Sequence, residues 1–216
     1  MYTECVRLEG VTSWKKENGF RFNRLNWSMS QGDRILMIEN LGSGSKELFD
    51  IIVGYQMPQE GKVMINGRLA VIQERFPVLE GLTVKEYMNL AFEGSTKKWG
   101  NDIVDSFLKE HELWEKREYT AEYLTLSERC RLQFAMAQAL EPNVLIMGSC
   151  WKYLRENELE QFWNHVRKQV EETGVSFMSF SEIMFTELDS FRSTWTGWFS
   201  HIYALKNGIL TEVEMG

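Results

Sequence analysis

The feature that most constrains the fold is an apolar run followed by a glycine-containing loop and a helical pattern. The run Arg34–Ile38 reads RILMI and predicts a buried strand. The loop NLGSGSKE follows at residues 40–47, and residues 45–53 show helical spacing. A strand, a glycine loop and a helix in this order bring backbone amides and the positive end of a helix dipole together, which is how proteins cradle phosphate. The alternative at this point is an ordinary tight turn.

The rest of the chain alternates between strand and helix patterns. Residues 1–33 contain short alternating stretches and turn signals, which are typical of strands and hairpins. Strand patterns then lie at 61–67, 69–73, 143–148, 175–181 and 201–214, and helical patterns at 83–140 and 155–173. This alternation predicts an α/β fold with a parallel core sheet and an antiparallel portion near the start. No repeat or linker divides the sequence, so we expect a single domain over residues 1–216.

Composition indicates which partners and which cellular compartment this chain is expected to have. The 216 residues carry a net charge of −7, which argues against binding to a nucleic-acid backbone. The three cysteines, Cys5, Cys130 and Cys150, show no metal-binding spacing, and an odd number predicts reduced thiols in a cytosolic compartment. We found no signal-peptide pattern and no apolar run of the ~18 residues that a membrane span requires. The sequence therefore predicts a cytoplasmic protein.

Four further segments, together with the glycine loop, resemble one family in the order in which they occur. They are GYQMPQEGKVMING (54–67), VIQERFPVLEGLTVKEYM (71–88), LTLSERCRLQFAMAQALEPNVLIM (124–147) and YALKNGIL (203–210). They are similar to the ATP-binding cassette (ABC) ATPases that drive ABC transporters. The resemblance implies a P-loop NTPase-like ABC ATPase core with a parallel sheet and an antiparallel β portion at the N-terminus. It also implies a helical subdomain, about residues 76–135, between the Q-loop, where Gln73 takes the Q position, and the Walker B strand.

The glycine loop departs from the family pattern G-x-x-x-x-G-K-[ST], in which Lys neutralises phosphate and Ser/Thr holds Mg²⁺. The register places Glu39 at the first glycine, Ser45 at the lysine and Lys46 at the Ser/Thr position. A charge displaced by one residue is turned about 100° around a helix, so Lys46 need not reach the same phosphate. The candidate phosphate-binding residues are Gly42, Ser43, Gly44, Ser45, Lys46 and Glu47.

The catalytic positions that the resemblance implies are replaced as well. The Walker B strand should end in Asp-Glu, which supply the Mg²⁺ shell and polarise the attacking water, but the chain has Gly148 and Ser149. The D-loop position holds Arg155, and the switch position after Ser181 holds Glu182 in place of histidine. The histidines, all of which we expect on the surface, are His111, His165 and His201.

Two more positions are candidates for nucleotide contact. Ser127 keeps the serine of the signature motif, which in the family contacts the γ-phosphate bound by the opposite subunit. A plain N-cap of a helix over 128–140 is compatible with the same residue. Trp14 is the best candidate for the aromatic ring that stacks on adenine. The aromatic tract at 191–201 favours core or partner packing.

The combined losses predict a degenerate ABC subunit with no catalytic residues of its own. We expect weak or absent ATP binding, no Mg²⁺ site and no independent hydrolysis. The resemblance implies docking on a transmembrane permease at the inner face of the membrane. It also implies pairing with a second ABC ATPase subunit, with a heterodimer favoured over a homodimer.

Two other interpretations stay open. One is a regulatory or scaffold protein that uses the ABC fold to bind proteins without nucleotide. The other is an active ATPase that uses Lys46 and Glu182, which is disfavoured because no carboxylate replaces the pair lost at the end of the Walker B strand.

Overall fold

The strands among the described residues form two sheets in the computed structural model. The structure describes residues 3–13, 22–39, 44–95, 102–181, 196–206 and 208–213. In the smaller sheet, β1 (Glu4–Thr12) lies between β2 (Leu25–Ser30) and β4 (Glu60–Ile65) and is antiparallel to both. The antiparallel portion predicted near the start of the chain is therefore confirmed.

The larger sheet has the strand order β5-β6-β7-β3-β8-β9. Its strands are β3 (Arg34–Glu39), β5 (Leu69–Ile72), β6 (Val144–Met147), β7 (Ser176–Ser181), β8 (His201–Lys206) and β9 (Ile209–Glu212). Every pairing is parallel except β8–β9, which is antiparallel. The parallel core is confirmed, as is the C-terminal hairpin.

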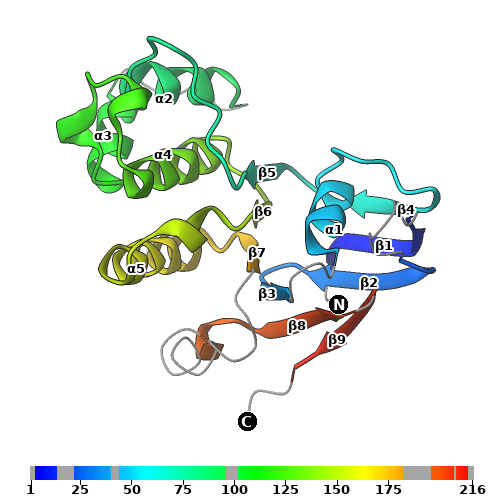
Figure 1. The fold of residues 1–216 in the computed structure, drawn as a ribbon. Helices are drawn as coiled ribbons and strands as arrows, with labels where there is room; N and C mark the ends of the chain where they lie inside the picture. The colour runs from blue at the N-terminus through cyan, green and yellow to red at the C-terminus, as the bar shows by residue number, and fades with distance from the viewer. Residues whose placement is uncertain are drawn as a thin grey trace.

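The helices are divided between the core and a separate helical group. They are α1 (Ser45–Ile52), α2 (Val84–Glu93), α3 (Ile103–Glu110), α4 (Leu126–Ala139) and α5 (Glu156–Thr173). Figure 1 shows α2, α3 and α4 grouped away from β1, β2 and β4, with α5 beside the larger sheet. The helical group has its own apolar cluster, which includes Val84, Met88, Leu108 and Leu132. None of the helices among the described residues is both long and apolar enough to cross a membrane.

The larger sheet is apolar on both faces, because alternate residues of each strand enter different clusters. Along β3, Leu36 and Ile38 pack with α4 and α5, whereas Ile35 and Met37 pack with α1 and β1. A strand that is covered on both faces reads as a continuous apolar run. This is why RILMI was recognisable as a buried strand.

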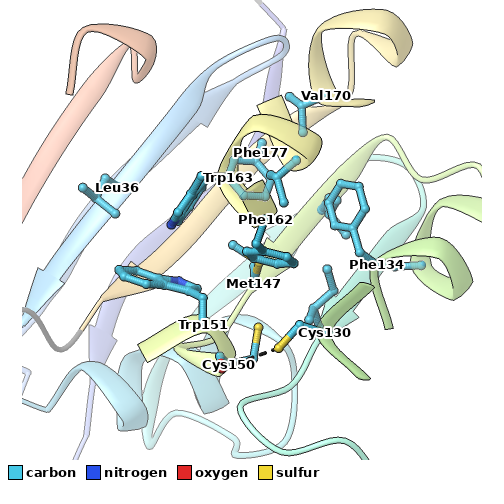
Figure 2. Close-up of a cluster of buried hydrophobic side chains, with 14 of the residues drawn as sticks. Leu36, Cys130, Phe134, Met147, Cys150, Trp151, Phe162, Trp163, Val170 and Phe177 are labelled. Carbon is cyan, nitrogen blue, oxygen red and sulfur yellow. Dashed lines mark hydrogen bonds between the residues drawn. The ribbon is translucent and has the colours of Figure 1, made fainter. Parts of the chain in front are cut away.

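Trp163 of α5 is at the centre of the cluster on the α4/α5 face (Figure 2). Its ring centroid lies 5.2 Å from that of Trp151 and 6.3 Å from that of Phe177. Trp198 and Phe199 pack against the same ring, at 6.3 and 5.8 Å, and both are buried. The described end of the aromatic tract at 191–201 therefore belongs to the core, which was one of the two roles expected for it.

The prediction that all three histidines lie on the surface is wrong. His111 follows α3 and is fully buried, and His165 on α5 is half-buried. Their ring nitrogens Nδ1 and Nε2 lie 2.9 Å apart. The two residues are 54 positions apart in the chain, so no local pattern could have shown that they pair.

Candidate functional site

The helix that follows the glycine loop begins where the sequence predicted. α1 starts at Ser45, and Gly44 before it has φ 92° and ψ 17°, a left-handed conformation that glycine adopts without strain. Ser45 is buried. The other two residues of the expected backbone nest, Gly42 and Ser43, lie outside the described residues.

The Lys46 side chain is directed along its own helix. Lys46 Nζ lies 2.8 Å from Asp50 Oδ2, one helical turn further on, and the lysine side chain is 76% exposed. An (i, i+4) pair of this kind forms on the surface of a helix. Glu47, also a candidate, accepts a hydrogen bond from Gln56 Nε2 at 3.2 Å. Neither charged group is held toward the end of β6.

The two residues after β6 are hydrogen-bonded to the ends of the neighbouring strands β5 and β7. The Gly148 amide donates to the Ile72 carbonyl at 2.8 Å, and the buried Ser149 hydroxyl donates to the Phe180 carbonyl at 3.2 Å. A Cβ atom added at Gly148 would lie 3.2 Å from the Glu74 backbone nitrogen and 3.4 Å from the Ile72 oxygen. Glycine at 148 therefore lets β5 and β6 approach at their carboxyl ends, where the family pattern has a carboxylate.

Gln73 bridges three parts of the structure from the end of β5. Its backbone amide donates to Gln133 Oε1 of α4 at 3.1 Å. Its side-chain Nε2 donates to the Tyr55 hydroxyl at 2.9 Å, in the segment after α1. The residue at the Q position is thus bonded within the chain on both its backbone and its side chain.

An ion pair next to Gln73 ties the end of β5 to the segment after β6. Lys152 Nζ lies 2.9 Å from Glu74 Oε1, and the Tyr153 hydroxyl donates to the same oxygen at 3.1 Å. The side chains of Glu74 and Lys152 are only 32% and 18% exposed. The hydrogen bond from Lys152 lowers the pKa of Glu74, against an opposing effect of burial.

These residues surround a cleft of about 370 Å³. Its described lining is Ser45, Lys46, Phe49, Asp50, Tyr55, Gln73, Glu74, Arg75, Gly148, Ser149 and Phe180. The structure therefore brings together the start of α1, the Q position and the end of β6, as the resemblance implied. The sequence reasoning missed Tyr55, Asp50 and Glu74. Only Asp50 had a local signal, because it follows Lys46 by four residues.

The described oxygen donors of the cleft can be compared with the ligands that Mg²⁺ prefers. This ion requires oxygen ligands, normally with one or two carboxylates. Among the described lining residues the carboxylates are those of Asp50 and Glu74, and each is paired with a lysine. The Ser149 hydroxyl is occupied by the Phe180 carbonyl. The residues present are therefore arranged for internal pairing.

Known proteins resemble this chain in sequence and in fold. No family model matches the chain. It is 24% identical over 206 residues to the ABC transporter ATP-binding protein YtrE of Bacillus subtilis, covering 86% of this chain and 87% of that one. It is 23% identical over 187 residues to the molybdate/tungstate import ATP-binding protein WtpC of Pyrococcus abyssi, covering 78% and 52%. The chain is a homologue of ABC transporter ATP-binding subunits. It spans about half the length of several of these curated relatives.

Solved structures confirm the predicted fold class. The dimeric post-hydrolysis state of the ATP-binding cassette MJ0796, bound to ADP and phosphate, matches with a TM-score of 0.79 and 18% identity over 98% of this chain and 99% of that one. An ATP-binding subunit of an ABC transporter matches with a TM-score of 0.80 and 16% identity, covering 98% and 90%. The protein has the ABC ATPase fold.

The alternative interpretation of Ser127 in this ABC cassette as an N-cap is wrong. α4 begins at Leu126, and its N-cap is Thr125, whose side chain accepts from the Glu128 amide while Glu128 bonds back to the Thr125 amide. Ser127 lies in the first turn and is only 8% exposed. It is not among the described residues that line the cleft. The expected role of Ser127 toward a partner's nucleotide stays a prediction.

A second, apolar groove of about 330 Å³ lies between the end of β5 and the helical group of the cassette. Gln73 lines this groove as well as the cleft. The other described lining residues are Val71, Phe76, Pro77, Leu90, Ala91, Gln133, Met136, Ala137 and Leu140, and none carries a charge. The remaining sequence candidates, Trp14 and Glu182, lie outside the described residues.

We predict that Lys152→Met lowers the free energy of unfolding by about 1 kcal/mol at pH 7, because it leaves the half-buried Glu74 carboxylate without its cation. Since the pKa of Glu74 is lowered in the fold, this contribution is present above its usual value of 4.5 and is lost as the pH falls below it. The loss caused by the substitution should therefore shrink between pH 5 and 3. Urea unfolding at several pH values measures both effects.

Lys62→Met is the matched control. Lys62 Nζ also lies 2.8 Å from a carboxylate, Glu9 Oε2, but its side chain is 60% exposed. We expect a change of less than about 0.5 kcal/mol. Equal losses for the two variants would show that the Glu74–Lys152 pair does not tie β5 to the segment after β6.

Proposed function

We propose that this chain is a degenerate ATP-binding subunit of an ABC transporter that does not hydrolyse ATP by itself. The observation that carries the proposal is that both described carboxylates of the cleft are paired with lysines of the same chain. Asp50 is paired with Lys46 and Glu74 with Lys152, while a Cβ atom at Gly148 would make a tight contact, 3.2 Å, with the Glu74 backbone nitrogen. A cassette needs one carboxylate for its metal and one to polarise water, and the described lining of this cleft offers neither in unpaired form.

Association with a permease is supported by the apolar groove between β5 and the helical group. The groove has no charged lining, and Leu90 on its rim is 48% exposed. An exposed apolar surface of this kind marks an interaction site. The segment at 76–77 forms one wall, and Gln73 connects the groove to the cleft. We propose that the permease docks here, which would hold the chain at the cytoplasmic face of a membrane.

A heterodimer with an intact ATPase subunit fits the cleft better than a homodimer. Two copies of this chain would form two sites that both lack the carboxylates, so the assembly could not turn over ATP. An intact partner would supply its own phosphate loop and carboxylates, and this chain would add Ser127. Relatives named as molybdate/tungstate import and zinc import proteins support an importer as the host assembly.

A regulatory or scaffold protein without nucleotide is the second candidate. The observation that favours it is that Gln73 and Ser149, at the Q position and the end of β6, are hydrogen-bonded within the chain. Gln73 is bonded to Tyr55 and Gln133, and Ser149 to Phe180. On this proposal the fold serves only to bind proteins, and the groove would accept a partner other than a permease.

We predict that the isolated protein shows no Mg²⁺-dependent ATPase activity above background. The double variant Gly148→Asp/Ser149→Glu, which restores the Walker B carboxylates in sequence, should also be inactive and less stable. The reason is that a side chain at 148 meets the backbone of Glu74 and Ile72. Phosphate release measured against ATP concentration tests both proteins. Saturable release from the natural chain would overturn the proposal.

In a purified complex with an intact ATPase subunit and a permease, we predict that Ser127→Ala slows ATP turnover about tenfold. A hydrogen bond to a charged group contributes roughly 1.5–3 kcal/mol, and ~1.4 kcal/mol corresponds to one decade in rate. Thr125→Ala is the control, because it removes the N-cap of α4 at a cost of about 1 kcal/mol in stability without removing the Ser127 hydroxyl. Unchanged turnover in a folded Ser127→Ala complex would favour the scaffold candidate.

A further inference from the structure

Three helices meet at a polar cluster inside the protein, away from the cleft. His111 at the end of α3 faces His165 of α5, with Nδ1 and Nε2 2.9 Å apart. Phe134 of α4 packs against both imidazoles, at ring-centroid distances of 6.0 and 5.9 Å. Phe107 packs against His111 at 5.6 Å. The hydrogen bond between the two histidines is therefore enclosed by aromatic rings.

The hydrogen bond requires that one of the two facing ring nitrogens carries no proton. The other ring nitrogen of His111, Nε2, is in a position where an added proton is unfavourable. His111 Nε2 is buried and has no hydrogen-bond partner in the described part of the structure. If His111 Nδ1–H donates to His165 Nε2, the buried Nε2 of His111 is a bare acceptor. Charging His111 would place a second N–H at that nitrogen, where no described group accepts it.

Charged groups around the pair come from all three helices. Arg131 of α4 forms an ion pair with Glu112, just after α3. Glu110 belongs to α3 and Lys168 to α5. Burial, then His165 and then Arg131 lower the pKa of His111 to about 3. Burial and then Arg131 lower the pKa of His165 to about 4, with Lys168 adding to the effect and Glu112 and Glu110 opposing it.

Two further hydrogen bonds between side chains join these helices, beside their apolar packing. Gln169 Nε2 of α5 donates to Glu110 Oε1 of α3 at 2.9 Å, and Gln138 Nε2 of α4 donates to Gln169 Oε1 at 3.2 Å. The end of α3 is thus attached to α5 through hydrogen bonds that involve side chains at 110, 111, 165 and 169. Hydrogen bonds hold only while both partners keep the required protonation state.

We propose that the His111–His165 pair is a proton-sensitive latch that holds the end of α3 in the helical group to α5 in the core. A second proton on the accepting imidazole removes the hydrogen bond, whereas a second proton on the donating imidazole keeps the bond but leaves a charge in an aromatic environment. The end of α3 then separates from α5, while the sheets stay folded. α3 packs against α2 and α4, which line the apolar groove. Mild acid therefore loosens the proposed docking surface.

The direction of the pH dependence follows from proton binding. The usual pKa of histidine, 6.5, is well above the values in the latched state. The released state therefore binds more protons below pH 6.5, and the latch is at full strength only above that pH. The opening equilibrium should rise about tenfold between pH 7.5 and 5.5 for each imidazole that becomes exposed.

Hydrogen exchange of the full chain tests this latch, expressed as protection factors so that the intrinsic pH dependence of exchange is removed. Between pH 7.5 and 5.5 we expect protection to fall at least tenfold in peptides covering 103–113 and 160–170. Protection in β6 and β7 should stay unchanged. Constant protection at 103–113 down to pH 5.5, or an equal loss in β6 and β7, would overturn the proposal.

The double variant His111→Asn/His165→Gln keeps a neutral amide hydrogen bond near the same atoms but cannot be protonated. Its protection at 103–113 should not depend on pH. His201→Gln is the control, because His201 lies on the exposed hairpin and bonds to Glu212 Oε1 at 2.7 Å; it should behave as the natural chain does. A pH response that persists in the double variant would contradict the latch.

Imidazole ¹⁵N NMR of the natural chain gives a test that does not depend on a variant folding. His111 and His165 should both be neutral at pH 6, one as donor and one as acceptor. An imidazolium signal at either residue at this pH would overturn the proposal.

Discussion

The close approach of β5 and β6 at their carboxyl ends determines what the cleft can hold. The Gly148 amide bonds to the Ile72 carbonyl, and a Cβ atom at 148 would lie 3.2 Å from the Glu74 backbone nitrogen. Glycine at 148 avoids this tight contact. In the ABC ATPase fold this is the position from which a carboxylate enters the catalytic site. On the proposed function, the backbone packing here agrees with the glycine that the sequence has in place of that carboxylate.

Two of the cations at the described cleft, Lys46 and Lys152, are paired with carboxylates of the same chain, and Arg75 also lines the cleft. Lys46 is directed to Asp50, and Lys152 is held between the end of β5 and the segment after β6 by Glu74. A bound nucleotide would have to replace these contacts with contacts to phosphate and metal, without the family's lysine or carboxylates to stabilise the exchange. The fold is thus retained, and on the proposed function these internal contacts take the place of the nucleotide chemistry.

The sequence predicted most of the fold, because its strongest signals are local. The continuous apolar run of β3 follows from burial on both faces, and the glycine before α1 from its left-handed backbone. The displacement of Lys46 also followed from helix geometry. Contacts between distant segments could not be predicted: Glu74 meets Lys152 across 78 positions, and His111 meets His165 across 54. The capping of α4 was misplaced because both Thr125 and Ser127 are good caps, and only the backbone decides between them.

Calorimetric titration of the isolated protein with ATP, in the presence and absence of Mg²⁺, tests most directly whether this cleft has lost its nucleotide chemistry. The account predicts weak or undetectable binding that Mg²⁺ does not strengthen, because the described carboxylates are paired with Lys46 and Lys152. Affinity on the order of micromolar that depends on Mg²⁺, equivalent to about −8 kcal/mol, would contradict it.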